Sequence, residues 1–211
     1  ITEAWFKSPG EYWAPTSSMA GYRFVQGVAA ILGSAAETVD LDSAYLQSFA
    51  LDSQIYLDLD EALVEQLGDD WQRAIRHEKD EDIRLGGTGQ IVFPIVKNIY
   101  GKCDAGTNFI ESFQQSLLAC GWVRLTHCYG TFLRVCTHTG KPMVLCNYVD
   151  DLAVVLTDES RDTVWGEISR FWKFDPARRA HKFLGIVTWC SPCGRHIRLS
   201  QSEYLALVVK R

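Results

Sequence analysis

Tyr148-Val149-Asp150-Asp151 places two carboxylates side by side at a point where the chain can turn. The residues before it (143–147) and after it (152–156) are short apolar runs rich in β-branched side chains, and this pattern predicts a β-hairpin. Two aspartates at a hairpin tip need solvent, cationic partners or a metal, because burying unpaired charges is costly. Carboxylate oxygens are the ligands that Mg²⁺ prefers, so the pair is a candidate metal site.

Most Asp-Asp pairs in surface turns are simply solvated, and this chain holds 26 acidic residues. A third acid, Asp40, ends a strand-like run far earlier in the chain, although Asp also commonly ends strands or caps helices. Three carboxylates gathered at one sheet edge repel each other and raise each other's proton affinity unless divalent cations neutralise them. Two Mg²⁺ ions held by such acids would support an in-line phosphoryl displacement.

Segments around these acids resemble, in order, the reverse transcriptase of Ty1/copia-type retrotransposons. Residues 148–151 match the family's Y-V-D-D box, and residues 39–47 (VDLDSAYLQ) are similar to its first-aspartate box. The remaining similar segments are 14–16 (APT), 55–57 (IYL), 99–101 (IYG), 183–186 (FLGI) and 199–204 (LSQSEY). The resemblance covers the chain from about Ala14 to its end.

The resemblance implies the palm of a right-hand polymerase, which adds deoxynucleotides to a primer 3′ end under the direction of a template. Its implied partners are an RNA or DNA template-primer and dNTPs. Asp40, Asp150 and Asp151 would bind two Mg²⁺ ions, or Mn²⁺ in their place, and carry the catalysis. The cellular setting that it implies is intracellular, in a cytoplasmic particle or in the nucleus.

The resemblance also assigns substrate contacts to Leu41, Tyr45, Asp104 and Tyr148. The Leu41 carbonyl is an additional metal ligand in this interpretation. Tyr45 falls at the steric-gate position, where an aromatic ring excludes a ribose 2′-hydroxyl. The alternative for Tyr45 is ordinary core packing beneath the strand.

The chain also departs from the family. Asp104 stands where the family has Gln, and it places an anion near the expected triphosphate, which is unfavourable unless a metal or base screens it. The neighbouring family Arg, a bidentate phosphate donor, is missing, as is the basic fingers segment. The net charge of −5 has the wrong sign for a freestanding nucleic-acid binder.

Two further hypotheses therefore stand beside an active polymerase. One is a degenerate or co-opted remnant that serves as a non-catalytic nucleic-acid-binding or structural module. The other is an unrelated two-metal nuclease or phosphatase, which needs more His and Asp ligands than the five scattered histidines suggest.

The order of predicted elements indicates an α+β fold, with a palm-like antiparallel sheet and helices packed on one face. Predicted helices span 16–32, 60–67, 105–119 and 158–174, and Ser200 is expected to cap a last one. We expect one reverse transcriptase-like domain over 1–211, with partial fingers at about 1–33 and 50–100 and palm elsewhere. The missing initiator Met suggests a segment of a longer polyprotein, with the remaining fingers, thumb and ribonuclease H lying outside it.

Seven cysteines, an odd number set largely among apolar residues, favour a reducing intracellular setting over a disulfide scaffold. Cys190 and Cys193, with His196 nearby, have half of a zinc-site spacing, but Ser-Pro-Cys-Gly is also ordinary turn chemistry. The sequence shows neither a signal peptide nor an apolar run long enough to span a bilayer.

Overall fold

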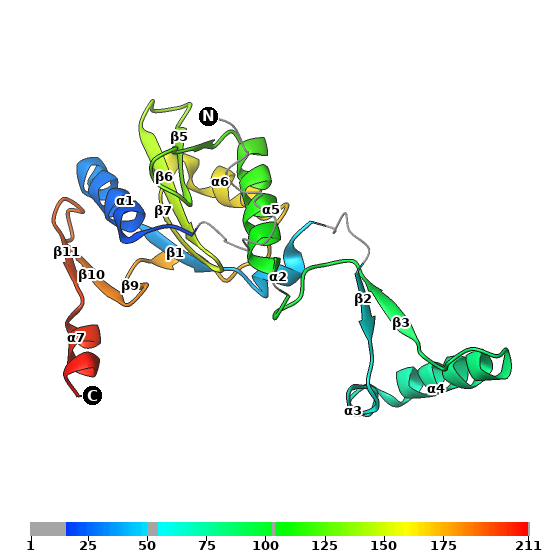
Figure 1. The fold of residues 1–211 in the computed structure, drawn as a ribbon. Coiled ribbons are helices and arrows are strands. Elements are labelled where there is room, and N and C mark those ends of the chain that lie inside the picture. The colour runs from blue at the N-terminus through cyan, green and yellow to red at the C-terminus, as the bar shows by residue number, and fades with distance from the viewer. Residues whose placement is uncertain (1–15, 50–54, 103, 211) are drawn as a thin grey trace. The chain divides into compact units, whose positions relative to one another are not determined.

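The computed structural model describes residues 16–49, 55–102 and 104–210, and it is a mixed α+β protein with antiparallel sheets (Figure 1). The chain divides into two compact units, one made of Ile1–Phe49 and Ile99–Arg211 and the other of Ala50–Asn98. The smaller unit spans nearly the same residues as the stretch at 50–100, whose assignment as fingers stays a prediction. The first helix, by contrast, belongs to the larger unit.

The larger unit contains a six-stranded antiparallel sheet in the order β4-β5-β6-β7-β1-β8. Its strands are β1 (Glu37–Asp40), β4 (Val123–Arg124), β5 (Thr131–Val135), β6 (Pro142–Tyr148), β7 (Asp151–Val155) and β8 (Arg178–Arg179). β6 and β7 form the predicted hairpin, and β1 pairs with the outer side of β7. The sheet thus brings the strand that ends at Asp40 next to the acidic hairpin.

Helices and a second, three-stranded sheet in the order β11-β10-β9 complete this unit. They are α1 (Met19–Leu32), α2 (Ala44–Gln47), α5 (Ala105–Ala119), η2 (Asp158–Ser160), α6 (Arg161–Ile168), β9 (Lys182–Phe183), β10 (Ile186–Cys190), β11 (Ile197–Ser200) and α7 (Ser202–Val209). The predicted helix at 158–174 is shorter, because α6 ends at Ile168, and Gln201 rather than Ser200 occupies the N-cap of α7. In the part of the chain that the structure describes, no helix is long and apolar enough to cross a membrane.

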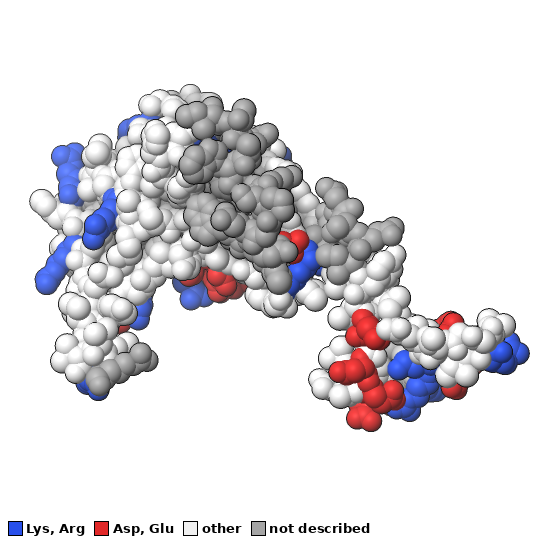
Figure 2. Space-filling model, in the orientation of Figure 1, with Lys and Arg blue, Asp and Glu red and all other residues white. Residues whose placement is uncertain are grey.

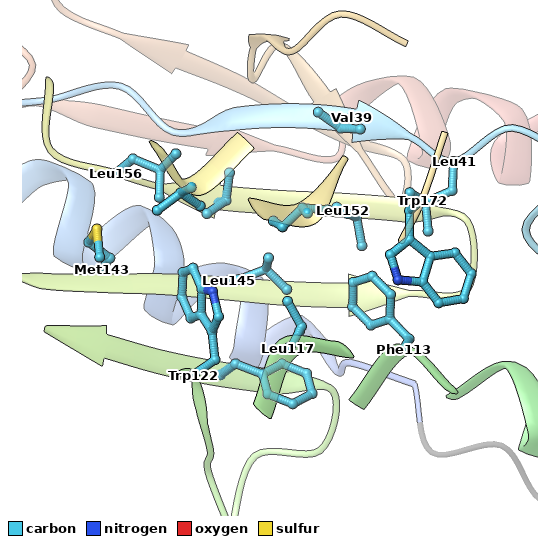
Figure 3. Close-up of a cluster of buried hydrophobic side chains, with 14 of the residues drawn as sticks. Val39, Leu41, Phe113, Leu117, Trp122, Met143, Leu145, Leu152, Leu156 and Trp172 are labelled. Carbon is cyan, nitrogen blue, oxygen red and sulfur yellow. The ribbon is translucent and has the colours of Figure 1, made fainter. Parts of the chain in front are cut away.

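Side chains from both faces of β6 and β7 are buried, so the prediction of helices on one face was wrong. One face, with Leu145 and Leu152, packs in a core with Phe113 of α5 (Figure 3). The opposite face, which includes Val144, packs with Tyr22 of α1. Because both strands are apolar at successive positions, each face must be covered, and α1 covers the face opposite α5 and α6.

The smaller unit is a two-stranded ribbon with a charged helix. It consists of β2 (Ile55–Asp58), α3 (Glu61–Val64), α4 (Asp69–Arg84) and β3 (Val92–Ile95), with β2 and β3 paired antiparallel. Asp60 caps α3, since its Oδ1 accepts a hydrogen bond from the Leu63 N–H at 2.8 Å. Acidic and basic side chains make up most of α4, and Ile75 is its one buried side chain.

Replacing Leu152 with Ala should lower the free energy of unfolding by about 2–5 kcal/mol, because the change removes packed methyl groups and leaves a cavity. Leu152 is fully buried in β7 (0% exposed). The matched control is Leu118→Ala in α5, where the side chain is 53% exposed and the cost should stay within about 0.5 kcal/mol. Urea denaturation followed by circular dichroism measures both, and equal losses would contradict this packing.

Candidate active site

The hairpin tip is held in one conformation by the backbone and by a buried amide. Tyr148 and Asp151 are directly opposite each other at the ends of β6 and β7, which leaves Val149 and Asp150 in the turn. Val149 has φ +53°, in the left-handed region that β-branched residues rarely adopt. The side chain of Asn147, which is buried, donates a hydrogen bond to the Val149 carbonyl at 2.6 Å. This bond supports the strained turn that presents the two acids.

The pairing of β1 with β7 brings Asp40 to this tip. Asp40 is the direct cross-strand partner of Asp151, and the Leu41 N–H donates to the Asp150 carbonyl at 2.9 Å. Side chains of directly opposed residues in an antiparallel pair lie on the same face, about 5 Å apart at Cβ. The structure therefore places the three predicted acids together, while their function stays a prediction.

Burial and mutual repulsion act on these carboxylates. The pKa of Asp151 is raised above its usual range, first by burial and then by the charges of Asp150 and Asp40. The pKa of Asp40 is also raised, first by burial and then by Asp150, Asp175 and Asp42. A cation bound beside these two acids would lower their pKa values again, because it favours the charged form of a carboxylate.

A small cavity of about 140 Å³ lies against the acids and has both signs of charge in its wall. Asp40, Asp151 and Asp175 line it together with Arg178 and Lys182. Asp175 is tied to β1, because its N–H donates to the Asp40 carbonyl at 3.1 Å. An arrangement of carboxylates facing cations suits a metal on one side and anionic oxygens on the other.

Asp175, Arg178 and Lys182 were not identified from the sequence. The available signal was the basic run that follows Phe174-Asp175-Pro176 and precedes the F-L-G-I segment. The sequence of this run does not show where it lies in the fold. The structure does, because β8 pairs with β1 and Arg178 lies opposite Thr38.

The acids at the hairpin tip offer oxygen ligands, which suit a hard divalent cation, but they do not enclose a metal site by themselves. Across residues 16–49, 55–102 and 104–210, no group of three or more His, Cys, Asp or Glu side chains is arranged to hold a metal ion. Asp40 and Asp151 supply carboxylate oxygens on one face, and Mg²⁺ commonly takes only one or two protein carboxylates, with phosphate and water oxygens completing its shell. The pair is therefore compatible with a metal that arrives with its substrate.

Tyr45 packs against the core, and its role as a steric gate stays a prediction. Its ring is half-buried and packs against Tyr100 and Phe109, with ring centroids 4.8 and 5.9 Å away. Burial and then the charge of Asp150 raise the pKa of its hydroxyl.

The other predicted substrate residues lie in different surroundings. Tyr148 is 40% exposed beside the acid pair, whereas the Leu41 side chain is buried. Asp104 lies at the start of α5, outside the lining of the 140 Å³ cavity, and forms an ion pair with Lys102 at 2.5 Å. Burial opposes ionisation of Asp104, but the hydrogen bond and charge of Lys102 lower its pKa overall. The unfavourable anion noted in the sequence is thus screened by a base.

Glu37 anchors β1 from the opposite end. Its largely buried carboxylate accepts hydrogen bonds from the Arg161 guanidinium and from Trp165 Nε1, the latter at 3.0 Å. Both donors belong to α6, so β1 is fixed between α6 and β7. This second attachment fixes the position of Asp40 and was not apparent from the sequence.

Replacing Asp151 with Asn should raise the free energy of unfolding at pH 7. This stabilisation should disappear at about pH 4, where the carboxyl of the wild type is largely protonated. A carboxyl whose pKa is raised in the folded state binds more protons folded than unfolded, so stability falls as pH rises through its titration. The gain should be below about 1 kcal/mol because solvent screens the acids.

Urea denaturation at pH 7 and pH 4 measures this effect. The control is Asp162→Asn in the first turn of α6, where an acid favours the helix and its loss should give no gain. A stabilisation by Asp151→Asn that is the same at both pH values would contradict the electrostatic picture.

Comparison with known proteins assigns no family to this chain. No protein-family model, curated protein or solved structure matches it. What the site does is therefore inferred from its own residues and geometry.

Proposed function

We propose that the chain is the catalytic core of an RNA-directed DNA polymerase, which transfers nucleotides to a primer 3′ end. The proposal is carried by one observation, the register that sets Asp40 directly opposite Asp151 with Asp150 in the adjoining turn. Reactions at phosphate need opposed charges held at fixed positions, since positioning and electrostatic stabilisation supply most of the catalysis. The partners in this proposal are an RNA or DNA template-primer and dNTPs.

Asp40 and Asp151, with Asp150 beside them, would hold Mg²⁺ or Mn²⁺ in this proposal. When bound, the metal would supply a Lewis acid that polarises phosphate oxygens and lowers the pKa of an attacking hydroxyl. The raised pKa values of Asp40 and Asp151 favour this use, because a cation offsets the repulsion that burial and neighbouring acids impose.

Two basic side chains lie beside the acids. Arg178 and Lys182 line the same cavity as the acids and supply positive charge for phosphate oxygens. Their present partners are Asp175, 3.7 Å from Arg178, and Glu203, 2.8 Å from Lys182. Exposed pairs of this kind contribute about 0–1 kcal/mol, so a phosphate can displace them at little cost.

Primer extension by the full-length protein, on an RNA template with dNTPs and Mg²⁺ or Mn²⁺, tests the proposal. Asp150→Asn should reduce synthesis at least 100-fold, roughly the loss seen when one preorganised electrostatic group is removed. The control is Asp158→Asn in η2, a 92%-exposed acid that pairs with Arg161 and does not line the cavity.

No synthesis by the full-length protein, or synthesis that Asp150→Asn leaves unchanged, would overturn the proposal. If the inactive chain still binds a template-primer, it is instead a non-catalytic nucleic-acid-binding module. The absence of both activities would leave only a structural role for the retained acids.

A further inference from the structure

Positive charge is concentrated near the end of the chain, although the whole chain is acidic. Residues 170–211 hold nine of the 21 Lys and Arg but two of the 26 Asp and Glu. The described part of this segment forms β8 to β11 and α7. In Figure 2, Lys and Arg atoms lie over the side of the larger unit that carries α1, β10 and β11, with few acidic atoms among them. This surface has the charge expected for an anionic partner.

The three-stranded sheet in this segment has one face packed and one face free. Its inner face includes Phe183, whose ring stacks on Tyr22 at 4.7 Å, and Thr188, whose hydroxyl lies 2.6 Å from the Tyr22 hydroxyl. Strand alternation directs the intervening side chains outward. The outward residues are Lys182, Val187, Trp189, Arg198 and Ser200. A rigid sheet therefore presents an aromatic ring among cations.

A groove runs along this outward face. It has a volume of about 470 Å³ and is lined by Val187, Trp189, Arg198, Ser200, Ser202 and Glu203. Trp189 is 56% exposed and is the direct cross-strand partner of Arg198. An exposed Trp offers a flat surface on which a base can stack, and Arg supplies donors for phosphate.

We propose that this outward face, centred on Trp189 and Arg198, binds a single strand of nucleic acid. A base stacks on Trp189, while Arg198 and Lys182 contact the phosphate backbone. Unpaired bases are required, because stacking on a protein ring needs an open base face. The concentration of basic residues favours this polyanion over an apolar protein partner.

The face also adjoins the carboxylate site. Lys182 lines the 140 Å³ cavity with Asp40 and Asp151, and its partner Glu203 lines the groove. A strand on the groove would therefore reach the acids through Lys182. The inference shares its class of partner with the proposed polymerase function, but it requires no metal and no reaction.

Fluorescence anisotropy with labelled oligo-dT and oligo-U of about 12 nucleotides, a length typical of single-strand sites, tests the inference. The assay contains EDTA and no dNTPs, so it is independent of catalysis. Trp189→Ala should weaken binding about tenfold. Arg198→Gln and Lys182→Gln should each reduce the slope of log K against log salt by about 0.7. Glu203→Gln should strengthen binding, because it frees Lys182.

The matched controls are Trp71→Ala and Arg73→Gln in α4, which change an equally exposed Trp and an exposed Arg of the smaller unit. Neither should alter the affinity. The inference is overturned if the wild type does not bind, or if Trp189→Ala binds as tightly as wild type. It is also overturned if Trp189→Ala acts only by breaking self-association, measured by light scattering. Intact binding without primer extension would reject the polymerase proposal alone.

Discussion

The antiparallel pairing of β1 with β7 is the constraint on which the site depends. Without it, Asp150 and Asp151 are two acids on a hairpin tip, and Asp40 is the end of an unrelated strand. The pairing concentrates like charges where burial already opposes ionisation, so it costs free energy unless a cation is present. The register nevertheless holds, because the strands behind the tip are buried on both faces and Glu37 is anchored to α6. The core therefore holds in place a polar site that is unfavourable by itself.

Charge is divided across the larger unit in a way that suits chemistry on an anionic polymer. Acids gather at the hairpin tip, cations from β8 and β9 line a small cavity with them, and Arg198 follows on β11. The net charge of −5 does not show this division, because the excess of acidic residues lies before the last forty or so residues, which are basic overall. Net charge alone does not describe this local distribution, and binding depends on the local field of a surface.

Local patterns predicted much of the fold. The hairpin at 143–156, the helix at 105–119 and the strand that ends at Asp40 follow from periodicity and turn residues, which act over a few positions. The position of Asp40 beside Asp151 was a hypothesis drawn from the acids themselves and then from the family resemblance, and the register agrees with it. The covering of both sheet faces was missed, because a continuous apolar strand does not reveal which helix covers each face. Arg178 and Lys182 were missed for a related reason, since the pairing of β8 with β1 has no local signal.

Thermal unfolding with and without millimolar Mg²⁺ tests most directly whether the assembled acids hold a divalent cation. A ligand that binds only the folded state raises the midpoint temperature. The account predicts a higher midpoint with Mg²⁺ for the wild type, no such rise for Asp40→Asn, and a retained rise for Asp158→Asn. A rise of equal size in Asp40→Asn would show that the cation binds elsewhere and would contradict the assignment of these carboxylates.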